Sequence, residues 1–89
     1  MPLGLPLQNY CLLINDWTKA EKQILIEFGE KVRKIRREKG MTQADLVHEA
    51  GVHGNMIGRI ERGERAANVL QLFKIAKALG VNIDELFDL

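Results

Sequence analysis

The sequence predicts an all-α fold, with five helices packed into one compact domain over residues 18–89. Three observations support this prediction. Apolar residues recur at helical spacing, glycines end four of these runs, and no stretch alternates apolar and polar residues as a strand does. The 89 residues, of which 46% are hydrophobic, suffice for one core. We therefore expect no second domain for sensing a small molecule.

A segment without clear periodicity, residues 1–17, precedes this domain and contains Pro2 and Pro6. Such prolines favour turns and irregular backbone over a helix. We expect residues 1–17 to form an irregular apolar arm.

The first helix is predicted to begin at Thr18, because Thr18 and Glu21 have the spacing of a capping box. Gly40 is predicted to end it. The apolar residues that recur at helical spacing and are expected to face inward are Ile24, Phe28, Val32 and Ile35.

Two short helical runs follow, joined by a tight turn. Thr42 and Asp45 predict the start of the second helix, and Gly51 its end. The third helix follows within two or three residues and stops at Gly63. The residues expected to face inward are Leu46, Val47 and Ala50 on the second helix and Met56, Ile57 and Ile60 on the third. This arrangement is that of a helix-turn-helix spanning about residues 42–62.

Two further helices complete the prediction. Asn68 with Gln71 predicts the start of the fourth, which Gly80 ends, and Asn82 with Glu85 predicts a short fifth. Their inward residues are expected to be Val69, Leu72, Phe73, Ile75, Ala76 and Leu79, then Ile83, Leu86 and Phe87.

Positive charge is concentrated in the middle of the chain. The net charge is only +1, but residues 31–65 have nine basic against five acidic residues, or +4. Residues 1–30 sum to −2 and residues 66–89 to −1. The helix-turn-helix is therefore the part best suited to meet a phosphate backbone. The single cysteine, Cys11, and the lack of a signal-peptide pattern or membrane span predict a cytoplasmic protein.

The helix-turn-helix region and the helix after it resemble the Cro/repressor-type (XRE) helix-turn-helix family. The matching residues are Gly40-Met41-Thr42-Gln43-Ala44-Asp45-Leu46-Val47, Gly51-Val52, Ile57, Ile60-Glu61-Arg62-Gly63 and Ile75 to Val81. The resemblance covers about residues 26–87 without a gap. It implies a lambda-repressor-like five-helix domain whose third helix enters the major groove of DNA, usually as a dimer. Phage repressors and restriction-modification controllers are the family members that the short chain suggests.

The outward face of the third helix carries the candidate base-reading residues, Asn55, Arg59 and His53. Arginine pairs with guanine and asparagine with adenine in the major groove. The alternative for Arg59 is a phosphate contact or a pairing near Glu61. His53 stands where the family usually has a serine or threonine cap, and Gly54 and Gly58 offer no side chain for base reading.

The candidate phosphate-binding residues are Gln43, Arg62 and Arg65. Gln43 lies at the predicted start of the second helix, where backbone N–H groups favour an anion. Arg62 and Arg65 flank Gly63, which lets the backbone approach DNA. By resemblance, Arg36 and Glu61 form a buried structural ion pair. The other basic residues of the first helix are expected to form mostly a solvated face.

We predict a regulator that binds double-stranded DNA as a homodimer through its C-terminal helix, with Phe87 and Leu89 at the contact. The alternative for Phe87 is that it closes the monomer core. A repressor is favoured over an activator. No catalytic residue, metal site, cofactor or small-molecule ligand is expected, because His48-Glu49 lacks the second histidine of a zinc motif at Val52. The rival interpretation is a protein-interaction module of the same fold, of antitoxin or coactivator type.

Overall fold

The computed structural model describes residues 17–87, which form four α-helices and a final 3₁₀ turn. The helices are α2 (Lys19–Glu38), α3 (Gln43–Ala50), α4 (Met56–Glu61) and α5 (Val69–Leu79), and the turn is η1 (Ile83–Leu86). These residues contain no strand, so the all-α prediction is confirmed. The predicted arm lies outside the described residues, apart from Trp17.

The helix boundaries follow the capping signals. Capping boxes begin α2 at Thr18, α3 at Thr42 and α5 at Asn68. In the α3 box, Thr42 Oγ1 accepts from the Asp45 N–H at 3.0 Å, and the Asp45 carboxylate accepts from the Thr42 N–H at 2.8 Å. The four predicted stop glycines all have positive φ, between 67° and 73°, a conformation that disfavours other residues.

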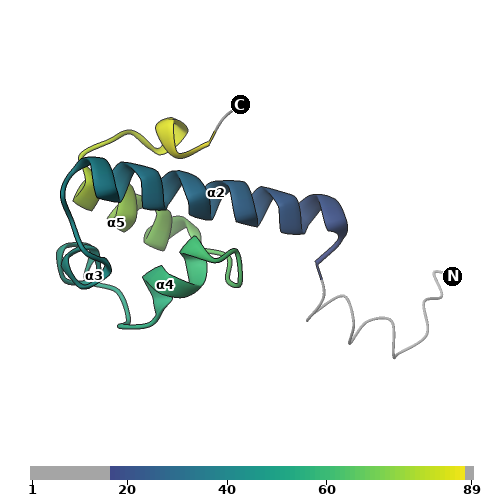
Figure 1. The fold of residues 1–89 in the computed structure, drawn as a ribbon, viewed down its shortest axis with the longest axis horizontal. Coiled ribbons are helices and arrows are strands. Elements are labelled where there is room, and N and C mark those ends of the chain that lie inside the picture. The colour runs from purple at the N-terminus through teal and green to yellow at the C-terminus, as the bar shows by residue number, and fades with distance from the viewer. Residues whose placement is uncertain (1–16, 88–89) are drawn as a thin grey trace, which may run out of the picture.

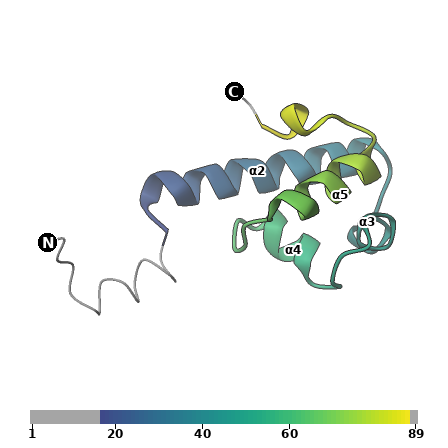
Figure 2. The same ribbon diagram turned by 180° about the vertical axis from the view of Figure 1, so that it is seen from behind.

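The long α2 lies across the domain, with the shorter helices packed under its C-terminal half (Figure 1, and from behind Figure 2). α3 and α4 form the helix-turn-helix, and α5 packs mainly on α3. The core lies between these elements. Its members that are 0–1% exposed are Val32, Leu46, Met56, Ile57, Ile60, Ile75 and Leu86.

Three residues that were predicted to face inward are exposed. Ile24 is 58% exposed because the N-terminal half of α2 extends past the other helices, where no described element covers it (Figure 1). Val69 is 66% exposed and Phe73 58%. The side of α5 with Ile75, Ala76 and Leu79 meets the core. The prediction also included Val69 and Phe73, which lie outside this contact, so the predicted inward face was too wide.

The chain end differs from the predicted fifth helix. Residues 83–86 form a single 3₁₀ turn, whose Leu86 enters the core. The ring of Phe87 stacks on Phe28 of α2, with centroids 5.1 Å apart. One face of the Phe87 ring therefore packs on the monomer core, as the alternative interpretation of this residue expected.

The crossing of α2 and α4 depends on a glycine whose role the sequence analysis missed. Gly29 is buried in the middle of α2, and a Cβ there would overlap the carbonyl oxygen of Ile60 and approach that of Glu61 to 2.8 Å. Because both neighbours are backbone atoms, they cannot turn away as a side chain can. Gly29 therefore sets how closely α4 approaches α2.

Candidate DNA interface

α4 begins later than predicted, at Met56, with Asn55 as its N-cap. The Asn55 side chain makes no capping hydrogen bond, so its amide is exposed and available for another partner. His53, predicted to hold the cap position, instead lies in the turn, and its carbonyl accepts from the Met56 N–H at 3.1 Å. The structure therefore separates His53, in the turn, from Asn55, at the N-cap of α4, and Arg59, within α4.

Arg59 lies one turn beyond Asn55 and is half-buried. It forms no ion pair within residues 17–87, although its positive charge is one of the causes that lower the pKa of Glu64. Its guanidinium is therefore available to an external acceptor. The opposite face of α4, with Met56, Ile57 and Ile60, is locked in the core.

Gly58 was predicted to lie on the outward face of α4, but it is buried. A Cβ at this position would lie 3.2 Å from Arg62 Nη1 and 3.4 Å from Gln43 Oε1. The side chains of Gln43, from α3, and Arg62, from the end of α4, therefore close over this glycine. A larger residue at position 58 would push them apart.

A buried ion pair joins α2 to the last residue of α4. Arg36 holds both carboxylate oxygens of Glu61, with Nε donating to Oε2 at 2.7 Å and Nη2 to Oε1 at 3.1 Å. Its third nitrogen, Nη1, donates to the carbonyl of Met41 at 2.8 Å. The Arg36 side chain is 8% exposed and that of Glu61 0%. This bidentate geometry fixes the C-terminal end of α4 against α2.

Glu61 has two further partners that the sequence analysis did not predict. Gln43 Nε2 donates to Glu61 Oε1 at 3.0 Å, and Arg33 Nε approaches the same oxygen at 3.5 Å. Burial alone raises the pKa of Glu61, but the hydrogen bonds from Arg36 and Gln43 and the charge of Arg36 outweigh it and lower the pKa below its usual value. Glu61 is therefore ionised near neutral pH. Gln43, a predicted phosphate contact, is part of the frame that holds α4.

The loop after α4 carries the other two predicted phosphate contacts. Arg62 pairs with Glu64, Nε to Oε2 at 2.9 Å, and both side chains are about half exposed, at 52% and 51%. Arg65 is half-buried, and its Nε has no hydrogen-bond partner in the structure. The two arginines therefore differ. Arg62 must break its ion pair with Glu64 before it can bind a phosphate, whereas Arg65 has no such pair in the described structure.

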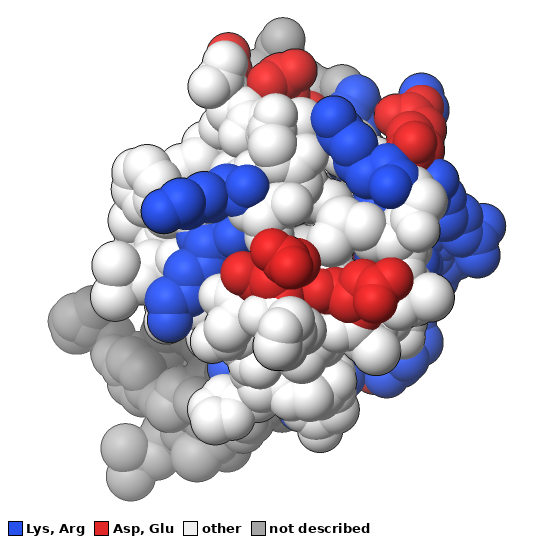
Figure 3. Space-filling model, turned by 90° about the vertical axis from the view of Figure 1, so that its left-hand side faces the viewer, with Lys and Arg blue, Asp and Glu red and all other residues white. Residues whose placement is uncertain are grey.

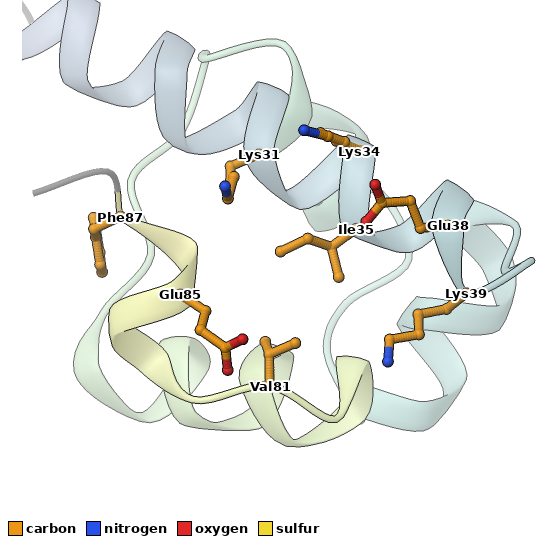
Figure 4. Close-up of a pocket in the computed structure, with 8 residues that line it drawn as sticks. All are labelled: Lys31, Lys34, Ile35, Glu38, Lys39, Val81, Glu85 and Phe87. Atoms are coloured by element: carbon orange, nitrogen blue, oxygen red, sulfur yellow. The ribbon is translucent and has the colours of Figure 1, made fainter.

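Charges elsewhere on the described surface are mixed. At the end of the molecule that carries α3, acidic side chains lie in the middle with lysine and arginine on both sides (Figure 3). The cleft between α2 and η1 is mixed as well (Figure 4). It is lined by Lys31, Lys34, Ile35, Glu38, Lys39, Val81, Glu85 and Phe87. Neither region is a uniform positive surface for a polyanion.

Two smaller clefts flank α3. One is lined by Met41, Asp45, His48, Glu49 and Ala78. The other lies beside the α3–α4 turn and is lined by Gly51, Val52, His53, Gln71 and Lys74. Within residues 17–87 no group of three potential metal ligands comes together, and no described helix is long and apolar enough to span a membrane.

Comparison with known proteins agrees with this geometry. Residues 32–86 match a family model described as helix-turn-helix. The control protein C.BamHI of Bacillus amyloliquefaciens is 44% identical over 66 residues, which cover 73% of this chain and 82% of that protein. The control protein C.MunI of Mycoplasma sp is 34% identical over 65 residues, covering 72% and 88%.

Solved structures give the same result. The restriction-modification controller protein C.AhdI from Aeromonas hydrophila superimposes with a TM-score of 0.69 at 35% identity, over 71% of this chain and 96% of that one. The similarity therefore extends over nearly the whole of a protein of that kind, whereas 29% of this chain lies outside it.

Proposed function

The chain belongs to the Cro/repressor (XRE) type of helix-turn-helix DNA-binding regulators, and we propose on this premise that it is a sequence-specific repressor that binds a two-fold-related operator as a homodimer. One observation supports the DNA-reading part above all. α4 is locked into the core on one face and exposes Asn55 and Arg59 on the other. A rigid helix with directional donors outside is what major-groove reading requires.

The proposed roles of the site residues follow from where they lie. Asn55 and Arg59 read base edges, and each good bidentate contact contributes about 1–3 kcal/mol of discrimination. Arg62 and Arg65, in the loop after α4, hold phosphates, as does Gln43 beside them. His53, in the turn, was predicted to read a base and lies two residues before Asn55, the N-cap of α4. Arg36 and Glu61 hold the frame and do not touch DNA.

The proposed dimer needs an apolar contact, and besides the predicted contact at Phe87 and Leu89 the exposed apolar side chains of α5 support one there. Phe87 is half-buried against Phe28, and Leu89 lies outside the described residues. The first turns of α5 expose Val69, Leu70 and Phe73 by 66%, 70% and 58%. These residues directly follow the loop with Arg65, so a two-fold contact there brings the phosphate-binding loops of both copies near the axis.

The dimer contact is tested by sedimentation equilibrium. Phe73→Glu is expected to weaken self-association and cooperative binding to two half-sites, while binding to a single half-site stays the same. A dimer as stable as that of the wild type would contradict the α5 contact. Phe87→Ala is the comparison, because it removes a core ring and is expected to lower the thermal midpoint.

The function itself is tested by selecting bound duplexes from a random DNA pool and measuring affinity against salt concentration. A repressor is expected to enrich an inverted repeat and to lose affinity steeply as salt rises. Absence of both enrichment and salt dependence would favour the protein-interaction module instead. Reporter transcription in the cytoplasm of a bacterial host then distinguishes repression from activation.

The names of its relatives support a controlling role, and we propose that this control depends on the concentration of the protein. C.AhdI is a restriction-modification controller protein, and C.BamHI and C.MunI are called control proteins. The same helix-turn-helix domain is suited to the same kind of control, in which occupancy of the operator follows the amount of protein. Operator titration in the reporter host, with the protein supplied at graded levels, measures that dependence.

A further inference from the structure

The cleft beside the α3–α4 turn differs chemically from the other two clefts described above. Its polar side chains are His53 from the turn and Gln71 and Lys74 from α5, and no carboxylate lines it. The α2–η1 cleft contains Glu38 and Glu85, and the α3 cleft contains Asp45 and Glu49. Of the three, only this cleft combines hydrogen-bond donors with a positive charge and has no negative charge to repel an anion.

The donors in this cleft are available. Lys74 is exposed and forms no ion pair within the described residues. The Gln71 side chain is oriented by its capping role, since its Oε1 accepts from the Asn68 N–H at 3.0 Å. Its Nε2 is therefore left to donate. The His53 side chain is exposed and makes no hydrogen bond within residues 17–87.

The cleft also lies in the right place relative to α4. His53 is two residues before Asn55, the N-cap of the reading helix, whereas Arg62 and Arg65 follow the other end of that helix. A major groove is bordered by phosphates on both sides, so a helix lying in it meets one backbone near each end. The Arg62–Arg65 loop accounts for one end only.

We propose that the cleft formed by His53, Gln71 and Lys74 binds a backbone phosphate of the DNA, at the N-terminal end of the reading helix. This inference rests on the proposed DNA-binding function and adds a contact from α5, outside the helix-turn-helix. It also changes the role of His53 from a base contact to a phosphate contact. Lys74 supplies the charge, and His53 and Gln71 supply directional hydrogen bonds to the phosphate oxygens.

The test compares Lys74→Gln with Lys77→Gln, because Lys77 is an exposed lysine on the same helix that does not line the cleft. Affinity for the selected operator and for random duplex is measured over a series of salt concentrations. Lys74→Gln is expected to weaken binding to both DNAs by the same several-fold factor and to reduce the salt slope by about one. Lys77→Gln is expected to leave the slope unchanged. Equal slopes for wild type and Lys74→Gln would overturn the proposal.

His53→Ala tests the changed role of the histidine. A phosphate contact predicts weaker binding with the base preference retained at every position of the operator. A relaxed preference at one base pair would restore His53 as a base reader and would contradict its part in the cleft. Both α5 variants and His53→Ala alter exposed side chains, so circular dichroism is expected to show an unchanged fold.

Two further outcomes separate this inference from its premise. Wild-type protein that neither selects DNA nor responds to salt would overturn the proposed function itself. Wild-type protein that selects an operator, with Lys74→Gln indistinguishable from it, would overturn only the cleft. Inorganic phosphate at the same ionic strength as chloride is expected not to displace the DNA, and displacement that depends on Lys74 would instead indicate a site for free phosphate.

Discussion

The buried corner where α2 crosses α4 (Gly29, Arg36 and Glu61) and the reading surface at the start of α4 are constrained to very different degrees. In the buried corner no side chain fits at Gly29, and both oxygens of Glu61 are held by Arg36. On the reading surface, Asn55 has no capping hydrogen bond and Arg59 no ion pair in the described structure. α4 belongs to both regions. Its C-terminal end is fixed in the buried corner, and this sets the position of the proposed base-reading residues at its N-terminal end.

This difference predicts that the buried corner sets stability and the reading surface sets DNA preference. A change in the corner should unfold or shift α4 whatever DNA is offered. A change on the reading surface should leave the fold intact and alter only which sequence is bound.

Gly29→Ala is expected to have the largest effect. Its Cβ would overlap the Ile60 carbonyl oxygen, so α4 must move away from α2 and the core between them must open. Overpacking usually lowers the free energy of unfolding by about 1–3 kcal/mol, and a clash with backbone that cannot turn away is expected to exceed that range. Chemical denaturation of the purified variant measures it.

Gly54→Ala is the matched control for this change. Gly54 lies in the turn before α4, has no positive φ, and a Cβ there would meet nothing within 4 Å. Its free energy of unfolding is expected to stay within about 1 kcal/mol of the wild-type value. If both alanines destabilised equally, the close approach at Gly29 would not be the reason.

Glu61→Ala is expected to be nearly as damaging, because it leaves the Arg36 guanidinium buried without its carboxylate. Breaking one side of such a pair costs about 3–5 kcal/mol of folding free energy. Glu64→Ala breaks the exposed pair with Arg62 and is expected to change the thermal midpoint little, since exposed pairs contribute little. A similar loss in both variants would contradict the distinction between the corner and the surface.

The same residue predicts a pH dependence. The pKa of Glu61 is lower in the folded protein than its usual value of 4.5, so the folded state binds that proton less readily than the unfolded chain does. Its contribution to stability is complete above about pH 4.5 and is lost as the pH falls from there through the lowered pKa of the folded state. Glu61→Gln is expected to lose less stability than the wild type as the pH falls. Chemical denaturation of both proteins at a series of pH values measures this difference.

Arg59→Ala tests the reading surface. It is expected to lose about 1–3 kcal/mol on the selected operator and to relax the preference at one base position, with the thermal midpoint almost unchanged. Arg65→Ala is the comparison, because a phosphate contact weakens all sequences alike. Unchanged operator preference in Arg59→Ala would show that α4 presents a different face to DNA.

The scaffold was largely predictable from the sequence because its signals are local. Thr18, Thr42 and Asn68 each satisfy a capping box within four residues, and the stop glycines need only their own φ. Gly29 gave a local hint as well, since a glycine in the middle of a helix is unfavourable unless packing requires it. The backbone atoms that lie against Gly29 belong to α4, and their approach depends on how two helices that are distant in the sequence cross.

The features that were missed depend on tertiary packing. Periodicity placed Ile24 and Phe73 on inward faces but could not show that α2 extends past the domain or that α5 is covered on one side only. Gln43 was expected at a phosphate, and its bond to Glu61 brings together residues 18 apart in the chain. The cleft with Lys74 likewise depends on α5 packing beside the turn, which no local pattern encodes.

The smallest expected effect concerns the loop that joins the two regions. Arg62 directly follows Glu61 of the buried corner, but its side chain lies on the surface and pairs with Glu64. The hydrogen bonds from Arg62 lower the pKa of Glu64. Glu64→Gln removes a negative charge beside the proposed phosphate contacts and frees Arg62 from its partner. We expect binding to all duplexes to tighten by a few-fold, with the salt slope slightly steeper and base preference unchanged. Weaker binding would mean that Glu64 orients Arg62 toward DNA, and the constraint found in the buried corner would then extend into the loop.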